Sequence, residues 1–141
     1  MHARDSILQL IKTALTFRGV TTGRSRVYPT DSAELPMILV YGRSEGTDWS
    51  GAVGSADRTM EVTVEVLVEA KDGDVDAKLN THCEAIENAL NPQGSIAGVL
   101  WSRVENTSFN WIHDGNLAIG IAELTVAVRY RTMTSDASAL I

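Results

Sequence analysis

The segment from Thr59 to Ala70 alternates between apolar and polar residues, and no other feature of the chain restricts its fold as strongly. The apolar set is Met60, Val62, Val64, Val66 and Val68, and the polar set is Glu61, Thr63, Glu65 and Glu69. Successive side chains of a β-strand point to opposite faces, so this pattern predicts a strand with one buried and one solvated face. The chain must therefore build a sheet that has a core on one side.

Two amphipathic segments predict helices that can cover the buried face. Between Asp5 and Phe17 the apolar residues recur at helical spacing, and Asp5 or Ser6 can cap the first turn. A second helix of about 16 residues begins after the acidic run 72–76 and is stopped by residues 91–94. Its apolar stripe consists of Val75, Leu79, Cys83, Ile86 and Leu90.

Further segments over 24–28, 37–41, 99–106 and 117–130 are typical of strands. The run from Met37 to Tyr41 is apolar without interruption, which indicates burial on both faces. Together these segments predict an α+β fold, in which a mixed, mainly antiparallel sheet of about five strands packs with two main helices. A length of 141 residues fits a single domain over 1–141.

Residues 43–57 show no periodicity and contain Gly46, Gly51 and Gly54, so we expect a mobile loop there. The tail over 132–141 is expected to be flexible too. Trp49 lies in the middle of the loop. Ordering a loop of this length costs on the order of 15–30 kcal/mol, whereas burying one Trp returns only about 3–6 kcal/mol. We therefore expect the loop to become ordered against a partner, with Trp49 as an anchor. The alternative is that Trp49 folds back over its own sheet.

No set of residues composes a recognisable catalytic, cofactor or metal site. The run Asp72, Asp74 and Asp76 has the spacing that begins a calcium loop, but position 77 lacks the required Gly and position 83 lacks the Glu. These carboxylates suit the start of the second helix, whose dipole they complement. The histidines are scattered at positions 2, 82 and 113. His82 and Cys83 diverge by about 100° on a helix, so they cannot act as a pair.

Glu61, Glu65 and Glu69 share one face of their strand and could serve a hydrolase as acid and base. Residues on the same face lie about 6.6 Å apart, and we favour an acidic surface that is solvated or faces another subunit. For Trp101, Phe109 and Trp111, packing in the core or on the sheet is a sufficient account. We expect no enzyme activity and no cofactor.

The net charge and the cysteine content argue against further classes of function and of site. With 12 Lys and Arg against 18 Asp and Glu the formal charge is −6, which disfavours nucleic acid as the principal ligand. A single cysteine, Cys83, excludes an internal disulfide and fits a reducing compartment. No run approaches the roughly 18 apolar residues of a membrane span, and the start of the chain has no apolar signal core.

Several short signatures follow one another in a fixed order. They are the opening amphipathic helix, Val27-Tyr28-Pro29-Thr30-Asp31, Leu35-Pro36-Met37-Ile38-Leu39-Val40, the strand over 58–68, Ile86-Glu87-Asn88-Ala89-Leu90 and Val126-Ala127-Val128-Arg129-Tyr130-Arg131-Thr132. Over residues 5–132 this order resembles the tail terminator and tail completion proteins of long-tailed bacteriophages. The resemblance implies a mixed α/β subunit without catalytic residues. Such a subunit forms a ring, usually a hexamer, which caps the growing tail tube and presents its other face to the head connector.

The resemblance also implies partners and a location. The partners are other copies of the chain, the tail tube protein and the head-tail connector, while DNA passes through without specific binding. The place is the head-proximal end of a phage or prophage tail, after synthesis in the bacterial cytoplasm. Candidate interface residues are Arg43, Asp48, Trp49, Arg58, Glu61 and Glu65. The alternatives are another head-tail joining or neck protein, a monomeric binding module with the glycine-rich segment as its recognition element, or a small hydrolase.

Overall fold

The computed structural model describes residues 1–24, 35–49, 51, 53–70, 74–90, 96, 98–114 and 117–141. The elements follow in the order α1 (Ala3–Ala14), β1 (Thr21–Gly23), β2 (Met37–Asp48), β3 (Ser55–Glu69), α2 (Val75–Ala89), β4 (Trp101–Asp114), β5 (Leu117–Met133) and β6 (Asp136–Leu140). The predicted strand over 24–28 falls mostly outside the described residues, and β1 lies just before it. Helix α1 starts earlier than expected because His2 caps it, with its Nδ1 accepting the Arg4 N–H at 3.0 Å.

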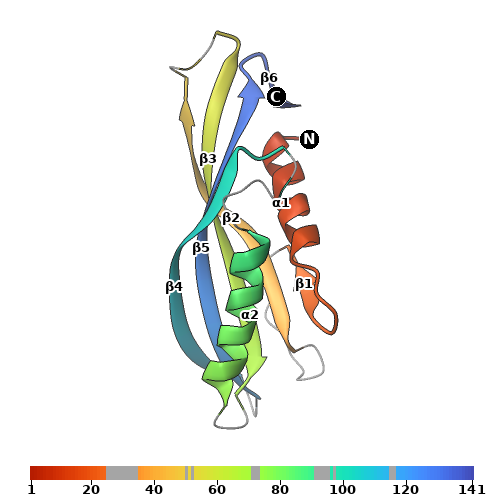
Figure 1. Ribbon diagram of the computed structural model, residues 1–141, viewed down its shortest axis with the longest axis vertical. Helices are drawn as coiled ribbons and strands as arrows, with labels where there is room; N and C mark the ends of the chain where they lie inside the picture. The colour runs from red at the N-terminus through yellow and green to blue at the C-terminus, as the bar shows by residue number, and fades with distance from the viewer. Residues whose placement is uncertain are drawn as a thin grey trace.

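The strands form one sheet in the order β1-β2-β3-β5-β4, with β6 also paired to β5. Among the strands of the described residues, only β1 and β2 run parallel, and the other pairs are antiparallel. The predicted α+β fold with a mixed, mainly antiparallel sheet is therefore confirmed. Figure 1 shows an elongated molecule in which β2, β3 and β5 continue past the ends of both helices.

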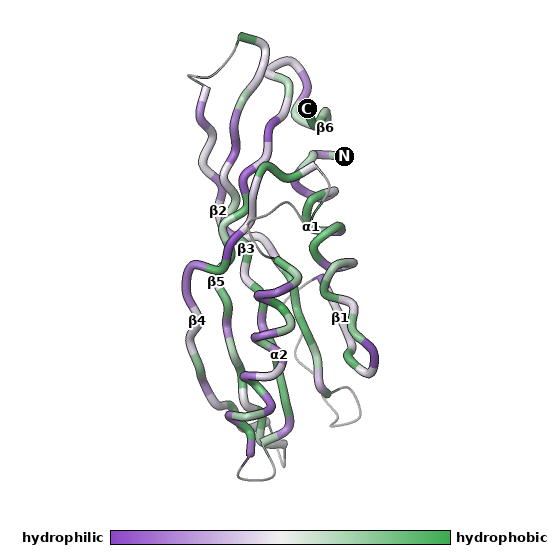
Figure 2. Tube along the Cα trace, viewed as in Figure 1, coloured by the Kyte–Doolittle hydropathy of each residue, from purple (hydrophilic) through white to green (hydrophobic). Residues whose placement is uncertain are grey.

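Both helices cover the same face of the sheet. The residues of β3 at even positions from Met60 to Val68 are buried against Ile7 and Ile11 of α1 and against the stripe of α2. That stripe is Val75, Leu79, Cys83, Ile86 and Leu90, as the sequence predicts. In Figure 2 the strand segments behind the helices are mainly apolar.

The other face of β3 is more buried than its sequence predicts. Thr63 is 0% and Glu65 is 1% exposed, so the expectation of a solvated acidic face is wrong at its centre. The reason is topological, because β3 lies between β2 and β5 and the side chains of its neighbours cover it. A second apolar cluster on this face contains Met37, Leu39, Leu67, Ile119 and Ile121. Glu61 is exposed and Glu69 is partly exposed.

The loop predicted over 43–57 is wrong for most of its length. Strand β2 continues to Asp48, and its pairing with β3 extends from Ser44↔Glu61 to Asp48↔Asp57. The two strands thus form a long hairpin that extends to Asp48 on β2 and begins again at Ser55 on β3. A register shift between Gly42 and Ser44 interrupts the alternation of β2, which is why its sequence has no period. The mobility of the segment stays a prediction.

The end of the chain is also more regular than expected. Strand β5 extends to Met133, and β6 pairs with it through Thr132↔Leu140 and Met133↔Asp136. The tail over 132–141 therefore contains a paired strand instead of irregular structure, and its flexibility stays a prediction. Leu140 packs against the main core, which gives the last strand an apolar contact that a ten-residue sequence window does not reveal.

Candidate assembly surface

The hairpin of β2 and β3 ends in an exposed apolar tip. Trp49 is 60%, Val53 106% and Met133 44% exposed, and we call these three residues the tip. The N–H of Thr134 donates to the carbonyl of Gly54 at 2.9 Å, which brings the end of β5 against the hairpin turn. The tip lies at the end of the molecule that extends past the helices (Figure 1). Exposed large apolar side chains at one end of a molecule are typical of contact surfaces.

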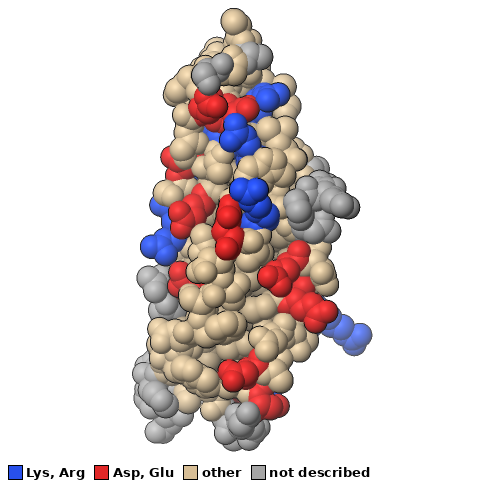
Figure 3. All heavy atoms as spheres, turned by 60° about the vertical axis from the view of Figure 1, so that its left-hand side comes forward, with Lys and Arg blue, Asp and Glu red and all other residues tan. Residues whose placement is uncertain are grey.

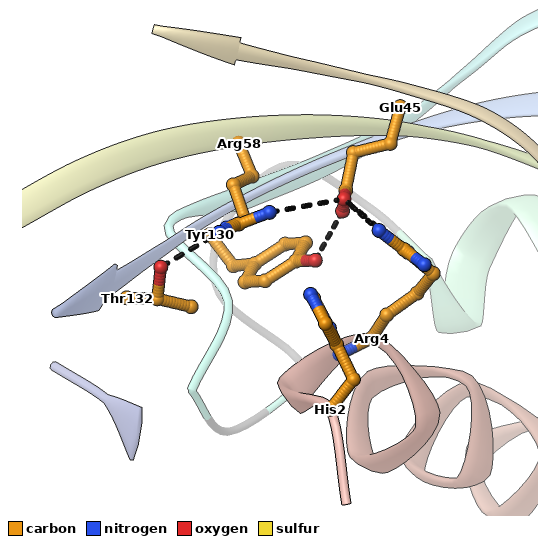
Figure 4. Close-up of polar contacts among 6 residues, drawn as sticks. All are labelled: His2, Arg4, Glu45, Arg58, Tyr130 and Thr132. Carbon is orange, nitrogen blue, oxygen red and sulfur yellow. Dashed lines mark hydrogen bonds and ion pairs between the residues drawn. The ribbon is translucent and has the colours of Figure 1, made fainter. Parts of the chain in front are cut away.

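A polar network lies on the helix side of the hairpin, and Glu45 is its centre. The Glu45 carboxylate accepts hydrogen bonds from Arg4 Nη2 at 2.5 Å, from Arg58 Nη1 at 3.4 Å and from the Tyr130 hydroxyl. Arg58 Nε in turn donates to Thr132 Oγ1 at 3.0 Å. Figure 4 shows Arg4 approaching from α1 and Arg58 and Tyr130 from the sheet. The network therefore ties the start of α1 to the hairpin.

The charges of this network are fixed by its geometry. Burial alone raises the pKa of Glu45, but hydrogen bonds from Arg4 and Tyr130 and the charges of Arg4 and Arg58 outweigh it, so the pKa lies below 4.5. Burial and the bond to Glu45 raise the pKa of Tyr130. Glu45 thus stays ionised and Tyr130 stays a hydrogen-bond donor at neutral pH.

Arg58 connects the network to the tip. Its guanidinium carbon lies 5.9 Å from the centroid of the Trp49 ring, within the range of a cation–π contact. The Arg58 side chain is only 11% exposed and is held by Glu45 and Thr132. The indole thus lies beside a fixed cation, although it remains largely exposed to solvent.

The opposite face of the hairpin carries acidic and basic side chains that form ion pairs with one another. Asp57 accepts from Arg131 Nε at 2.5 Å and from Arg129 Nη2 at 3.3 Å. Hydrogen bonds from these two arginines, Arg131 first, hold the pKa of Asp57 below 3.8. Arg43 and Glu123 pair at 3.3 Å lower down. Figure 3 shows basic and acidic residues intermixed over the upper half of this side. Because the charges of the described residues compensate one another here, those residues form no single-sign patch that would attract a polyanion.

The structure separates the six candidate interface residues into two groups. Arg43, Asp48, Trp49 and Glu61 are exposed. Arg58 and Glu65 are 9% and 1% exposed, and Glu65 accepts from the Tyr41 hydroxyl at 2.8 Å. Asp48, Trp49 and Arg58 come together near the tip, whereas Glu65 lies in the covered centre of the sheet. An interface role for these residues stays a prediction, and Arg58 can take part through Trp49.

Sequence reasoning missed the roles of Arg4, Glu45 and Tyr130. Arg4 and Glu45 are 41 residues apart, and Glu45 and Tyr130 are 85 apart. No local pattern links positions so distant, and only the register of the sheet brings them together. The available signal in the sequence was the presence of charged residues, Glu45 among them, in the glycine-rich segment 43–57.

The edge strand β4 carries two further exposed aromatic residues. Phe109 is 55% and Trp111 is 51% exposed, although core or sheet packing was expected for both. They lie on the outermost strand of the sheet, so neighbouring strands cover them on one side only. Trp101 on the same strand stacks with Arg103, whose guanidinium carbon lies 4.4 Å from the ring centroid.

The described residues contain no group of three or more His, Cys, Asp or Glu side chains that could hold a metal ion. Neither α1 nor α2, the helices of the described segments, has the length and apolar character needed to cross a bilayer.

No family model and no curated protein matches this chain. Among solved structures, it is similar to a chain of the virion of a native gene transfer agent particle. The two are 16% identical, with a TM-score of 0.52, over 87% of this chain and 82% of the other. A second solved chain, at 17% identity and a TM-score of 0.39, differs too much in shape to support an argument. At these identities the likeness to the virion chain shows a shared fold.

Proposed function

We propose that this protein is a structural component of a phage-like virion, and specifically the tail terminator. The observation that carries the proposal is the exposed apolar tip at the end of the long hairpin. The fold shared with a gene transfer agent virion chain supports the coarser part of the proposal, a structural component of a virion. In an isolated monomer, Trp49 remains 60% exposed to solvent beside the buried Arg58. In an assembly, a neighbouring subunit that covers the Trp49 ring gains binding free energy.

In this role, copies of the chain form a ring that lies on the last ring of tube protein. The family resemblance implies six copies in the ring. One face of the ring ends polymerisation of the tube protein, and the other receives the head-tail connector. The task is contact and not catalysis, so it needs no converging catalytic groups. The compensated charges of the sheet face, with the formal charge of −6, suit a channel that lets DNA pass without retaining it. The protein then resides at the head-proximal end of the tail.

The test is tail length. Removing the gene from the phage or prophage that encodes it should give tails longer than wild type and of uneven length, without heads attached, as measured by negative-stain electron microscopy. Expression of the wild-type chain in trans should restore uniform tails. In vitro, adding the chain to polymerising tube protein should stop growth. Uniform tails with unattached heads would instead favour another neck protein, and unchanged particles would contradict a role in the virion.

A further inference from the structure

A hollow of about 350 Å³ opens between the start of α1 and β2. Arg4 and Leu8 of α1 line one side, and Gly42, Arg43, Ser44, Glu45 and Met60 line the sheet side. This volume is at the small end of the range of roughly 300–1,000 Å³ that is usual for sites accepting a single small group. The hollow therefore has room for one large side chain and not for a folded segment.

Gly42 keeps this hollow open. A Cβ at position 42 would lie 3.5 Å from Met60 Sδ and 3.7 Å from Leu8 Cδ1, so a larger side chain there would occupy the space. The next glycine of the same strand, Gly46, has nothing within 4 Å of an added Cβ. Of these two glycines, therefore, only Gly42 borders a space that a side chain would fill.

The lining has the chemistry that an indole ring prefers. The Arg4 side chain is 42% exposed, so its guanidinium group is accessible. The guanidinium of Arg43 instead pairs with Glu123 on the opposite face of the sheet. Arg4 donates to Glu45 through Nε and Nη2, in the plane of its guanidinium, which leaves the face of that plane for stacking. The Met60 sulfur and the Leu8 side chain offer polarizable and apolar contact.

The chain's own Trp49 cannot enter this hollow. Trp49 lies seven positions beyond Gly42, and β2 is a continuous strand as far as Asp48. At about 3.3 Å per residue the two positions are roughly 23 Å apart. The indole instead lies beside Arg58, whose guanidinium carbon is 5.9 Å from the ring centroid.

We propose that Trp49 of one copy inserts into the hollow of the next copy, beside Arg4. The inserted side chain and its receiving site are different surfaces of the same chain, so the contact is heterologous and repeats from copy to copy. Such a contact closes into a ring when the rotation permits. This inference rests on the proposed ring and names the contact that builds it. A second copy is the occupant because one polypeptide carries both complementary surfaces.

Two variants test the contact by complementation. Trp49→Ala removes the inserted side chain and keeps the hollow, whereas Gly42→Val fills the hollow and keeps Trp49. Each variant alone should remain monomeric at concentrations where the wild type assembles, with association weakened by about 30-fold or more, as for the loss of a central aromatic anchor. Mixed together they should form a one-to-one dimer and stop there, as measured by light scattering coupled to size-exclusion chromatography.

Matched controls separate this contact from general effects. Gly46→Val alters the same strand without filling the hollow, and Trp111→Ala removes a tryptophan of similar exposure from the edge strand. Both should assemble as the wild type does. Gly42→Ala adds only a Cβ at ordinary contact distance, so it should fold and weaken assembly less than the valine. Circular dichroism checks that every variant is folded.

Results that differ from these expectations would overturn the inference that Trp49 inserts into the hollow. Rings formed by Trp49→Ala or by folded Gly42→Val, a mixture that stays monomeric, or a wild type that never associates would all contradict it. The proposed function fails by a different measurement, because it requires the change in tail length. Rings that control tail length but ignore both substitutions would leave the function in place and remove this contact.

Discussion

Glu45 is the residue on which the position of the hairpin most depends. Its side chain is 7% exposed and meets two arginines and a tyrosine from three separate parts of the chain. A buried carboxylate is costly unless its partners are complete, and removing one member leaves the others with unpaired charge. Glu123, by contrast, pairs with Arg43 where the side chains are 32% and 55% exposed. These two acidic residues allow the effect of burial to be measured within one sheet.

We predict that Glu45→Ala lowers the free energy of unfolding by about 3–5 kcal/mol, because Arg4 and Arg58 lose their common partner. Glu123→Ala, which breaks a solvent-exposed pair, should cost at most about 1 kcal/mol. Urea unfolding followed by circular dichroism gives both values. Equal losses in the two variants would show that the Glu45 network contributes no more than a surface pair.

The same carboxylate predicts an acid dependence. Because the pKa of Glu45 is lower in the folded chain than its ordinary value of 4.5, its stabilising contribution is complete above that value and is lost as the pH falls through the folded pKa. Stability of the wild type should therefore decline below about pH 4.5. Glu45→Gln should be less stable at pH 7 and should decline less steeply in acid. Thermal melts at pH 3–7 measure this, and parallel curves would refute it.

Among the elements, α2 and β5 approach each other closely at one point. A Cβ on Gly120 would lie 2.7 Å from Val75 Cγ2, a distance that real contacts do not show. Val75 is the first residue of α2 and is buried, so its branched side chain cannot move aside freely. The absence of a side chain at position 120 therefore sets how closely the helix lies on the sheet.

Gly120→Ala should destabilise the fold by about 1–3 kcal/mol through this overlap. Val75→Ala should be destabilising alone, because it removes buried methyl groups. Combined with Gly120→Ala it should cost less than the sum of the two, since the second change makes room for the first. A double-mutant cycle from chemical denaturation measures the coupling. Strict additivity would show that the helix shifts instead of clashing.

The elements themselves were largely predictable, and their extents were not. The alternation around Val64 and the stripe through Leu79 are local patterns, so the sequence predicted β3 and α2. The hairpin beyond Gly42 was missed because a register shift breaks the period there. Burial of Glu65 depends on the strands on either side of β3, which is information about pairing and not about the segment. The Glu45 network was missed for the same reason, while Trp49 could be recognised as an unusual aromatic among glycines.

At the scale of the whole molecule, the protein divides into a packed body and an extended hairpin. The body has helices on one face of the sheet and a small apolar cluster on the other. The hairpin relies on its strand ladder, the Glu45 network and surface ion pairs. Segments with few apolar contacts open with a lower free energy than the core does. The hairpin tip is therefore the part whose dynamics should respond most to assembly.

Hydrogen exchange should reveal this division. In the free subunit, backbone amides over 46–57 should exchange much faster than those of Val62 to Val66, because no helix covers the tip end of the hairpin. In assembled rings a neighbour covers Trp49, and protection over 46–57 should rise by at least about tenfold, equivalent to roughly 1.4 kcal/mol of local stability. Exchange at the centre of β3 should not change, which serves as the internal control. Equal hydrogen-exchange protection of residues 46–57 in the free subunit and in the rings would show that the hairpin tip is not part of the interface. A segment that becomes covered on assembly opens less often than it does in solvent, so its protection must rise.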